Sequence, residues 1–195
     1  MLEPTYDALR RQLVAGAWPA GHRLEAARLA DELGVSITPV RDALSRLTGE
    51  RLVDAAPGEG FRVPRLEAGD LRTLFAWHHR LMTMAIRWRG GPFPATSIPP
   101  GYDGIGERTA LLFGSIAATA RNSELNRAVN QAAARLNPCR QVEAAVIPDV
   151  EEELAALERL VGDGSRTALL EAIGRYHGRR KVAAERLAQA TRSEE

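Results

Sequence analysis

Cysteine and long apolar runs are almost missing from this sequence. The one cysteine, Cys139, cannot form a disulfide bond within the chain, and a chain without disulfides is typical of a reducing compartment. No apolar run approaches the roughly 20 residues that a membrane-spanning helix needs. The first residues also lack the charged-then-apolar order of a signal peptide. We therefore expect a cytoplasmic protein with no membrane partner.

An excess of charge of either sign is missing as well. The formal net charge is +1, and residues 1–65 contain nine Arg and nine Asp or Glu. This neutrality predicts modest non-specific affinity for a polyanion, so any attraction to nucleic acid must come from local placement of charge. Lysine is nearly absent, since every basic residue except Lys181 is an arginine. Arginine is the better bidentate ligand of phosphate and guanine, but so uniform a preference is better explained by coding bias.

Catalytic signatures are a third absence. The sequence has no nucleophile elbow, no phosphate-binding glycine loop and no His-x-x-x-His pair. The glycines of residues 101–106 (GYDGIG) follow no predicted strand, which excludes them as a nucleotide loop. We therefore expect a protein that is not an enzyme and has no cofactor.

Two short helical patterns separated by a turn are present over residues 24–47. The first ends at Gly34, which suits the left-handed position after a helix. Ser36 and Thr38 can each cap the second helix, and Pro39 suits its first position. The apolar stripe of the second helix consists of Val40, Ala43, Leu44 and Leu47.

A hairpin pattern follows these helices. Residues 52–53 and 61–63 are β-prone, and the residues between them are rich in turn formers. A further helical pattern, over residues 4–15, precedes the pair. Helix, turn, helix and hairpin is the order of a winged helix-turn-helix, whose second helix lies in the DNA major groove. The predicted fold class is mostly α, with a winged helix-turn-helix of three helices plus a β-hairpin wing at residues 1–66.

The runs LGVSITPVRDAL (residues 33–44) and WPAGHRL (residues 18–24) resemble the DNA-binding domain of GntR-family transcriptional regulators. The resemblance covers residues 4–65, with turn, cap, proline and arginine in register. It implies sequence-specific binding to double-stranded DNA. A winged helix that serves only structure or protein binding is the alternative.

DNA contacts are expected at the start of the second helix and on the wing. Hydroxyl groups and free backbone N–H groups at a helix N-terminus suit phosphate, and Arg41, one turn later, can reach a base edge. The candidate DNA-binding residues are Arg28, Ser36, Thr38, Arg41, Ser45, Arg46, Gly58, Gly60 and Arg62. Two arginine positions of the family fall on Ala27 and Ile37, so the family's usual operator sequence does not follow for this chain.

Residues 67–195 predict a separate, all-α helical bundle. Helical patterns cover residues 68–88, 107–121, 122–136, 149–161 and 166–191. Pro138 is expected to break the third helix, with helix resuming through Val146, and Val182 is expected to face inward. Residues 89–106 are rich in Gly and Pro and predict a long loop, either a cover over a pocket or a replacement for a lost helix.

A GntR-type domain followed by such a bundle is similar to the FadR-like subgroup. The similarity rests on helix order, Asn122, the Gly-Asp pair at residues 162–163, and His177. It implies that residues 67–195 form an FCD-type domain that binds a small effector, often a carboxylate, and dimerises.

Many members of that subgroup hold a divalent metal, whose ligand positions fall on Thr109, Phe113, Glu152 and near His177 in this chain. One His and one Glu do not make a zinc site. We therefore expect a degenerate FCD domain with no metal. His78 falls where the subgroup often has an effector-binding arginine, so His78 and His177 are the candidate effector-binding residues. Two satisfied core histidines are the alternative.

The function expected from these features is that of a homodimeric transcriptional regulator, a repressor, on a palindromic operator. An effector in the helical domain would shift the dimer between DNA-competent and incompetent states. Two alternatives stay open. One is a DNA-binding regulator with no effector, and the other is a helical enzyme or sequestration domain docked by a winged helix.

Overall fold

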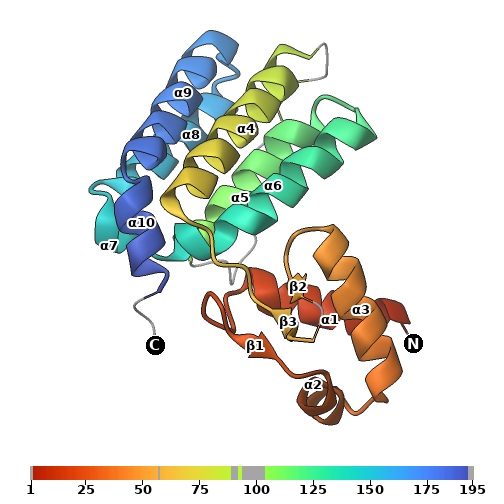
Figure 1. Cartoon of the computed structure of the whole chain (residues 1–195). Coiled ribbons are helices and arrows are strands. Elements are labelled where there is room, and N and C mark those ends of the chain that lie inside the picture. Colours follow the sequence, from red (N-terminus) through yellow and green to blue (C-terminus); the bar gives the residue numbers. More distant parts are fainter. Residues whose placement is uncertain (1, 57, 89–91, 94–103, 193–195) are drawn as a thin grey trace. The chain divides into compact units, whose positions relative to one another are not determined.

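The computed structural model (Figure 1) describes residues 2–56, 58–88, 92–93 and 104–192. Most of the loop predicted over residues 89–106 lies outside the described residues. The chain divides into two compact units, residues 1–66 with 191–195 and residues 67–190. Among the described residues, no helix combines the length and apolar character needed to cross a membrane.

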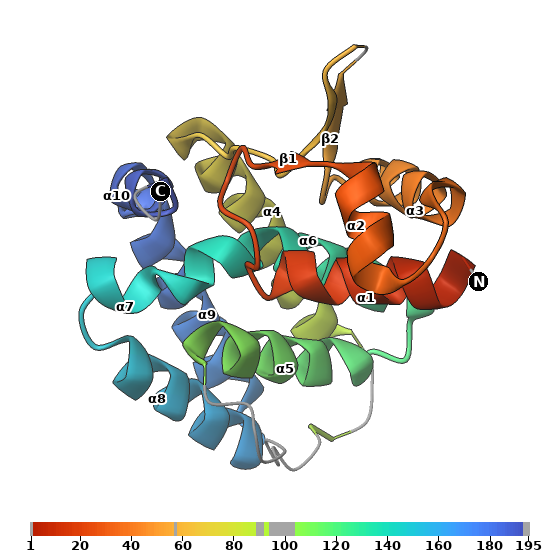
Figure 2. The same cartoon turned by 90° about the horizontal axis from the view of Figure 1, so that it is seen from below.

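The first unit is a winged helix-turn-helix, as predicted. Its helices are α1 (Leu2–Val14), α2 (Ala26–Leu33) and α3 (Ile37–Gly49), and its strands are β1 (Arg23–Leu24), β2 (Asp54–Ala56) and β3 (Gly60–Arg62). The strands form an antiparallel sheet in the order β1-β3-β2. The hairpin of β2 and β3 projects from the three helices as a wing (Figure 2).

The core of this unit lies mainly between α1 and α3. Leu9 of α1 is fully buried, as is the stripe of Val40, Leu44 and Leu47 on α3. Gly34 adopts the left-handed conformation (φ 65°) and ends α2, so the predicted turn is confirmed. Burial of these aliphatic side chains is the main source of stability.

The start of α3 differs from the prediction in one detail. Ser36 occupies the N-cap position, but its side chain makes no capping hydrogen bond. Helix α3 begins at Ile37, so Pro39 is the third helical residue rather than the first. Proline is tolerated there because the first N–H groups of a helix have no partner within it.

The predicted sheet is also corrected. Leu24 does not belong to the helix stripe. It lies in β1 and pairs with Phe61 of β3. The two hairpin strands lie at residues 54–56 and 60–62 rather than at 52–53 and 61–63. A single apolar residue fits a helix and a strand equally well, so only the pairing with β3 decides.

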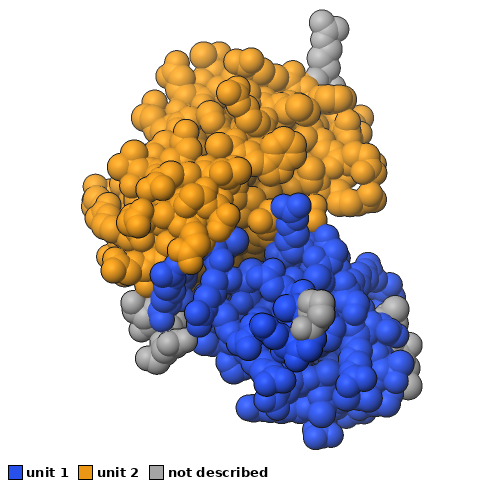
Figure 3. Space-filling model, viewed as in Figure 1, with its two compact units in different colours: residues 1–66, 191–195 blue, residues 67–190 orange. Residues whose placement is uncertain are grey.

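The second unit is an all-α bundle (orange in Figure 3). Its helices are α4 (Ala68–Arg87), α5 (Ile105–Ala118), α6 (Ser123–Gln141), α7 (Glu143–Val146), α8 (Val150–Gly162), α9 (Arg166–Val182) and α10 (Ala184–Ala190). Helix α4 lies between α9 and α6, α5 packs on α6, and α8 packs on α9 (Figure 1). The apolar faces of α4, α5, α6 and α9 therefore meet in a common core.

Two expectations about these helices are wrong. Pro138 does not break α6, which continues to Gln141. Leu136, Cys139 and Arg140 are buried on both sides of the proline, and their packing holds the helix line despite the missing hydrogen bond. Val182 is 83% exposed, because α9 ends there and α10 restarts after Ala183.

Candidate nucleic-acid interface and buried polar cluster

The exposed face of α3 carries three of the candidate DNA contacts. Thr38, Arg41 and Ser45 are exposed, and their spacing places them on one side of the helix, opposite the buried stripe. Ser36 lies directly before the helix, exposed and without a side-chain capping bond. Two hydroxyl groups and one guanidinium therefore border the N-terminal half of this face.

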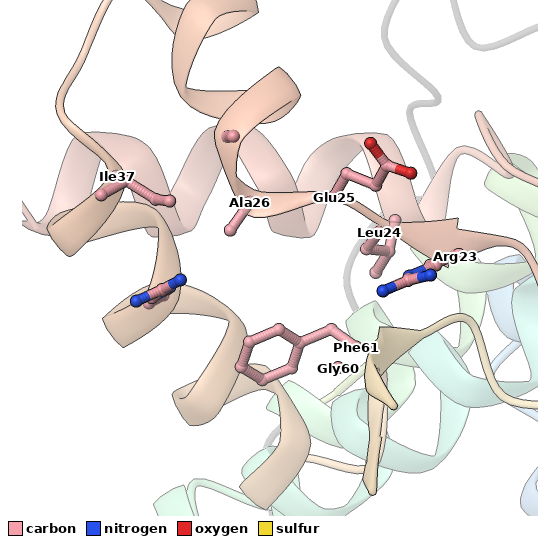
Figure 4. Close-up of a pocket in the computed structure, with 9 residues that line it drawn as sticks. Arg23, Leu24, Glu25, Ala26, Ile37, Gly60 and Phe61 are labelled. Atoms are coloured by element: carbon pink, nitrogen blue, oxygen red, sulfur yellow. The ribbon is translucent and has the colours of Figure 1, made fainter. Parts of the chain in front are cut away.

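A pocket of about 390 Å³ adjoins Arg41. Helices α2 and α3 and strands β1 and β3 contribute its walls, which include Ala26, Ile37 and Phe61. Figure 4 shows Ile37 and Phe61 on opposite sides of the pocket and the carboxylate of Glu25 turned away from the space between them. The second guanidinium at the pocket belongs to Arg23.

The sheet brings a further arginine beside Arg23. In the antiparallel register, Arg23 of β1 lies opposite Arg62 of β3, and Asp54 of β2 lies opposite Arg62 on the other side. Like charges directly opposite each other destabilise a strand pair. An anion bound near Arg23 and Arg62 would offset this repulsion.

The arginines of the first unit fall into two groups. Arg10, Arg28 and Arg46 are in ion pairs with carboxylates of the same unit. By contrast, Arg23, Arg41 and Arg62 make no ion pair within the part of the chain that the structure describes. Although residues 1–65 are neutral overall, their arginines without an ion pair include Arg23 and Arg41 at the pocket and Arg62 opposite Arg23.

The environment of Arg46 does not suit the predicted DNA contact. Its Nη1 donates to Glu3 Oε1 at 2.8 Å, and its guanidinium lies 3.8 Å from the ring centre of Tyr6. Tyr6 donates in turn to Glu50 Oε1 at 2.5 Å. Burial and this bond to Glu50 raise the pKa of Tyr6. Arg46 thus connects α3 to α1, and its DNA contact stays a prediction.

The ion pair of Arg28 is a weak argument against a DNA contact. Its Nε donates to Glu32 Oε1 at 2.9 Å, one turn along the exposed surface of α2. Exposed pairs of this kind contribute little to stability, so Arg28 stays a candidate.

The backbone conformation of the wing favours glycine at two positions. Gly58 and Gly60 have φ values of 80° and 81°, in the region that favours glycine. Apart from its chain neighbours, a Cβ atom at either position would meet no atom of the described residues within 4 Å. The space above both residues is therefore open to a ligand.

Arg23 and Phe61 were missed as site residues by the sequence reading. Phe61 was expected as a strand residue only, and Arg23 was not considered. The alternation of an exposed Arg23 with a buried Leu24 is a strand signal, but two residues are too few to read as one.

His78 and His177, the candidate effector residues, meet in the core of the second unit. His78 Nδ1 lies 2.8 Å from His177 Nε2, and both side chains are fully buried. Burial lowers the pKa of each well below the ordinary value, and the charge of Arg140 lowers both further. Both imidazoles are therefore neutral near pH 7.

The hydrogen bonds define which nitrogens carry protons. His177 Nδ1 lies 2.7 Å from the carbonyl oxygen of Ile173, so this nitrogen must donate. His177 Nε2 then accepts from His78 Nδ1. His78 Nε2 consequently holds a lone pair, and it has no hydrogen-bond partner among the described residues.

Two fully buried arginines lie in the same unit with different surroundings. Arg180 donates to Glu143 Oε2 at 2.7 Å and to Glu153 Oε2 at 2.5 Å. Burial opposes its charge, but Tyr176 and Glu143 raise the pKa of Arg180 above its ordinary value. Arg140 is 0% exposed, and in the described structure none of its three guanidinium nitrogens has a hydrogen-bond partner.

The positions that would hold a metal in the FadR-like subgroup do not fit one. The Thr109 hydroxyl donates to the Ile105 carbonyl, Phe113 offers no ligand, and Glu152 is exposed on α8. His177 has both ring nitrogens hydrogen-bonded. No group of three or more His, Cys, Asp or Glu side chains in the described ranges could hold a metal ion.

Comparison with known proteins finds a family similar to the first unit. Residues 3–63 match the family model "Bacterial regulatory proteins, gntR family". The HTH-type transcriptional regulator McbR of Escherichia coli (strain K12) is 40% identical over 78 residues, which are 40% of this chain and 35% of McbR. BphR of Paraburkholderia xenovorans (strain LB400), also an HTH-type transcriptional regulator, is 36% identical over 87 residues, 45% of this chain and 36% of BphR. The match thus spans little more than a third of these relatives.

Solved structures share the fold of nearly the whole chain. E. coli McbR/YncC aligns with a TM-score of 0.70 over 95% of this chain and 97% of that chain, at 20% identity. A putative transcriptional regulator GntR from Rhodococcus sp. RHA1 aligns with a TM-score of 0.73 over 94% and 96%, at 16% identity. Residues 3–63 are thus a winged helix-turn-helix domain that is similar to the GntR family of bacterial regulatory proteins.

Proposed function

We propose that this protein is a sequence-specific DNA-binding transcriptional regulator, and that it acts as a repressor. The observation that carries the proposal is the group of arginines without ion pairs, Arg23, Arg41 and Arg62, in the domain that matches the GntR family. Arg41 reads a base edge from the exposed face of α3, and Arg23 and Arg62 contact phosphate. Ser36, Thr38 and Ser45 add phosphate contacts at the helix, while Gly58 and Gly60 let the wing approach the DNA backbone.

The regulator acts as a homodimer on a palindromic operator. Trp77 and Met84 of α4 are 53% and 50% exposed, and Trp88 at its end is 42% exposed. Their spacing places them on one side of the helix, an apolar surface that a second copy of the chain would cover. A two-fold dimer presents two α3 helices to half-sites about one helical turn apart.

A small molecule in the helical unit controls DNA binding. The support is the polar cluster of the second unit, which brings the buried polar groups of His78, Tyr176 and Arg140 together and leaves His78 Nε2 without a hydrogen-bond partner among the described residues. An effector that binds one dimer state more tightly than the other shifts the DNA affinity by that difference.

Fluorescence anisotropy tests the DNA binding. Full-length protein is titrated into labelled DNA from upstream of its own gene, at two salt concentrations and with random-sequence competitor. The proposal predicts saturable binding that survives the competitor and weakens as salt rises, because bound phosphates release counterions. The proposal is wrong if no sequence, including those selected from a random pool, binds better than the competitor.

A further inference from the structure

An isoleucine begins the helix that carries the candidate DNA contacts. Ile37 is the first residue of α3, and its side chain is only partly buried. The apolar stripe on the other side of the same helix, by contrast, is fully buried. Ile37 therefore keeps apolar surface that the packing of the first unit does not enclose.

This apolar surface lies beside the candidate base-reading arginine. Residues four apart in a helix lie on the same face, one turn from each other, so Ile37 is the neighbour of the exposed Arg41. Both side chains line the pocket of about 390 Å³ in the first unit. Ile37 borders this pocket on one side and Phe61 borders it on the other (Figure 4). The side chain of Ile37 thus faces open space next to a guanidinium.

The charged groups around Ile37 favour a nucleic acid as the molecule that covers it. Arg23 and Arg41 line the same pocket without an ion pair among the described residues, and the carboxylate of Glu25 is turned away from it. A purely apolar ligand would leave both guanidinium groups without a partner. DNA offers phosphate to an arginine, and its major groove also exposes one apolar group, the C5-methyl group of thymine.

We propose that Ile37 determines sequence specificity by packing on the C5-methyl group of a thymine in the major groove. This inference rests on the DNA binding proposed above and names one base of the operator. Four residues of an α-helix rise about 6 Å, and successive bases of a strand are about 3.4 Å apart. The thymine therefore lies within about two base pairs of the base that Arg41 reads.

The branched side chain of isoleucine suits this contact. A β-branched residue in a helix has one strongly preferred χ1 rotamer. The methyl groups of Ile37 are therefore held in place before DNA binds, and little conformational entropy is lost on binding. Cytosine and uracil lack the C5-methyl group, so both lose the contact.

Replacement of single thymines by uracil tests the contact, since uracil pairs as thymine does but lacks the methyl group. The probe is a duplex that the full-length protein has enriched from a random DNA pool, with uracil at one thymine position of each half-site at a time. Anisotropy competition should find one thymine whose replacement weakens binding about fourfold per half-site, or about sixteenfold for two independent half-sites. At this position, a pair of 5-methylcytosine with guanine should bind tighter than a pair of cytosine with guanine by the same factor.

Variants assign the methyl group to Ile37. Ile37→Ser removes the apolar contact and should bind the thymine and uracil duplexes equally, whereas Ile37→Val should keep most of the difference. If Ile37→Ser fails to fold, Ile37→Asn, also short and polar, takes its place. Val35→Ser is the matched control, because Val35 is also half-buried but does not line the pocket. It should keep the wild-type ratio of the two affinities, and so should Arg41→Ala, which alters the reading of a different base.

Three results would overturn the inference. A loss on uracil replacement that is unchanged in Ile37→Ser and Ile37→Asn would assign the methyl group to another residue. An operator in which every thymine can be replaced by uracil without loss would remove the contact altogether. So would an operator with no thymine within about two base pairs of the position that Arg41→Ala relaxes.

The same data keep this inference distinct from the proposed function. An enriched operator that binds equally well with uracil would leave a sequence-specific regulator and remove the role of Ile37. A pool in which no sequence is enriched would remove the proposed function, and the thymine contact with it.

Discussion

Arginine has two different roles in the first unit, and single substitutions distinguish them. Arg46 is held by Glu3 and lies over Tyr6, whereas Arg41 is exposed and has no ion pair among the described residues. Charge and residue type are the same in both cases, so the sequence alone did not separate them. Only the packing of α3 against α1 shows which side of the helix each guanidinium occupies.

The substitution Arg41→Ala should weaken specific DNA binding by about 1–3 kcal/mol and relax one base position. Its unfolding midpoint should stay close to that of the wild type, because the side chain is exposed. Arg46→Met is the matched control on the same helix and should lower the midpoint while leaving sequence preference intact. Anisotropy and thermal unfolding measure both variants, and an Arg41→Ala protein with wild-type affinity would exclude Arg41 from base reading.

The buried histidines should make stability depend on pH. Burial lowers the pKa of His78 and of His177 in the folded protein, so below about pH 6.5 the unfolded chain binds more protons than the folded one. The free energy of unfolding should therefore fall as the pH falls below about 6.5, by about 1.4 kcal/mol per pH unit for each histidine, until the folded-state pKa is reached. Above about pH 7.5 the pair should add no pH dependence.

Urea unfolding between pH 5 and 8 measures this slope. The double variant His78→Phe, His177→Phe should have the flatter profile. Identical slopes for the wild type and the double variant would mean that the pair is protonated in the folded protein.

Helices and strands that depend on local sequence features were predicted correctly. The turn between α2 and α3 was predictable because Gly34 and the stripe of Val40, Leu44 and Leu47 are local features. Strand β1 was not, since Arg23 and Leu24 become a strand only by pairing with β3, far along the chain. Helix α6 passes through Pro138 because packing outweighs the local preference.

The buried cluster was predictable only in part. His78 and His177 stood out because a polar side chain is uncommon on the apolar face of a helix. Arg140 gave no such signal, because an arginine near the end of a helix is ordinarily solvated and stabilises the helix C-terminus. Arg140 is buried because α6 packs on α5, and the sequence of α6 alone does not show this packing.

The N-cap of α6 offers a test of local stabilisation. The side chain of Asn122 accepts a hydrogen bond from the backbone N–H of Leu125 at 3.0 Å. Asn122→Ala should therefore lower the free energy of unfolding by about 1 kcal/mol. Ser165→Ala is the matched control, because Ser165 occupies the N-cap of α9 without a side-chain capping bond. Chemical denaturation measures both, and equal losses would show that the Asn122 bond contributes nothing specific.

At the scale of the whole molecule, the proposal requires two copies of the chain. The double variant Trp77→Arg, Met84→Arg should convert a dimer into a monomer, because each arginine would bury a charge at the apolar face of α4. Val182→Arg, at another exposed apolar residue, should leave the dimer intact. Sedimentation velocity measures the mass of each, and an unaffected dimer in the double variant would place the interface elsewhere.

Selection of binding sites from a random DNA pool tests whether the winged helix-turn-helix reads DNA sequence. The full-length protein is incubated with the pool, bound DNA is amplified over successive rounds, and the enriched sequences are read. A dimeric regulator should enrich a two-fold symmetric sequence with half-sites about one helical turn apart. The Arg41→Ala variant should enrich a sequence in which one position of each half-site is relaxed. A pool that stays random after selection with folded, dimeric protein would contradict the proposed function, because the winged helix would then not read sequence.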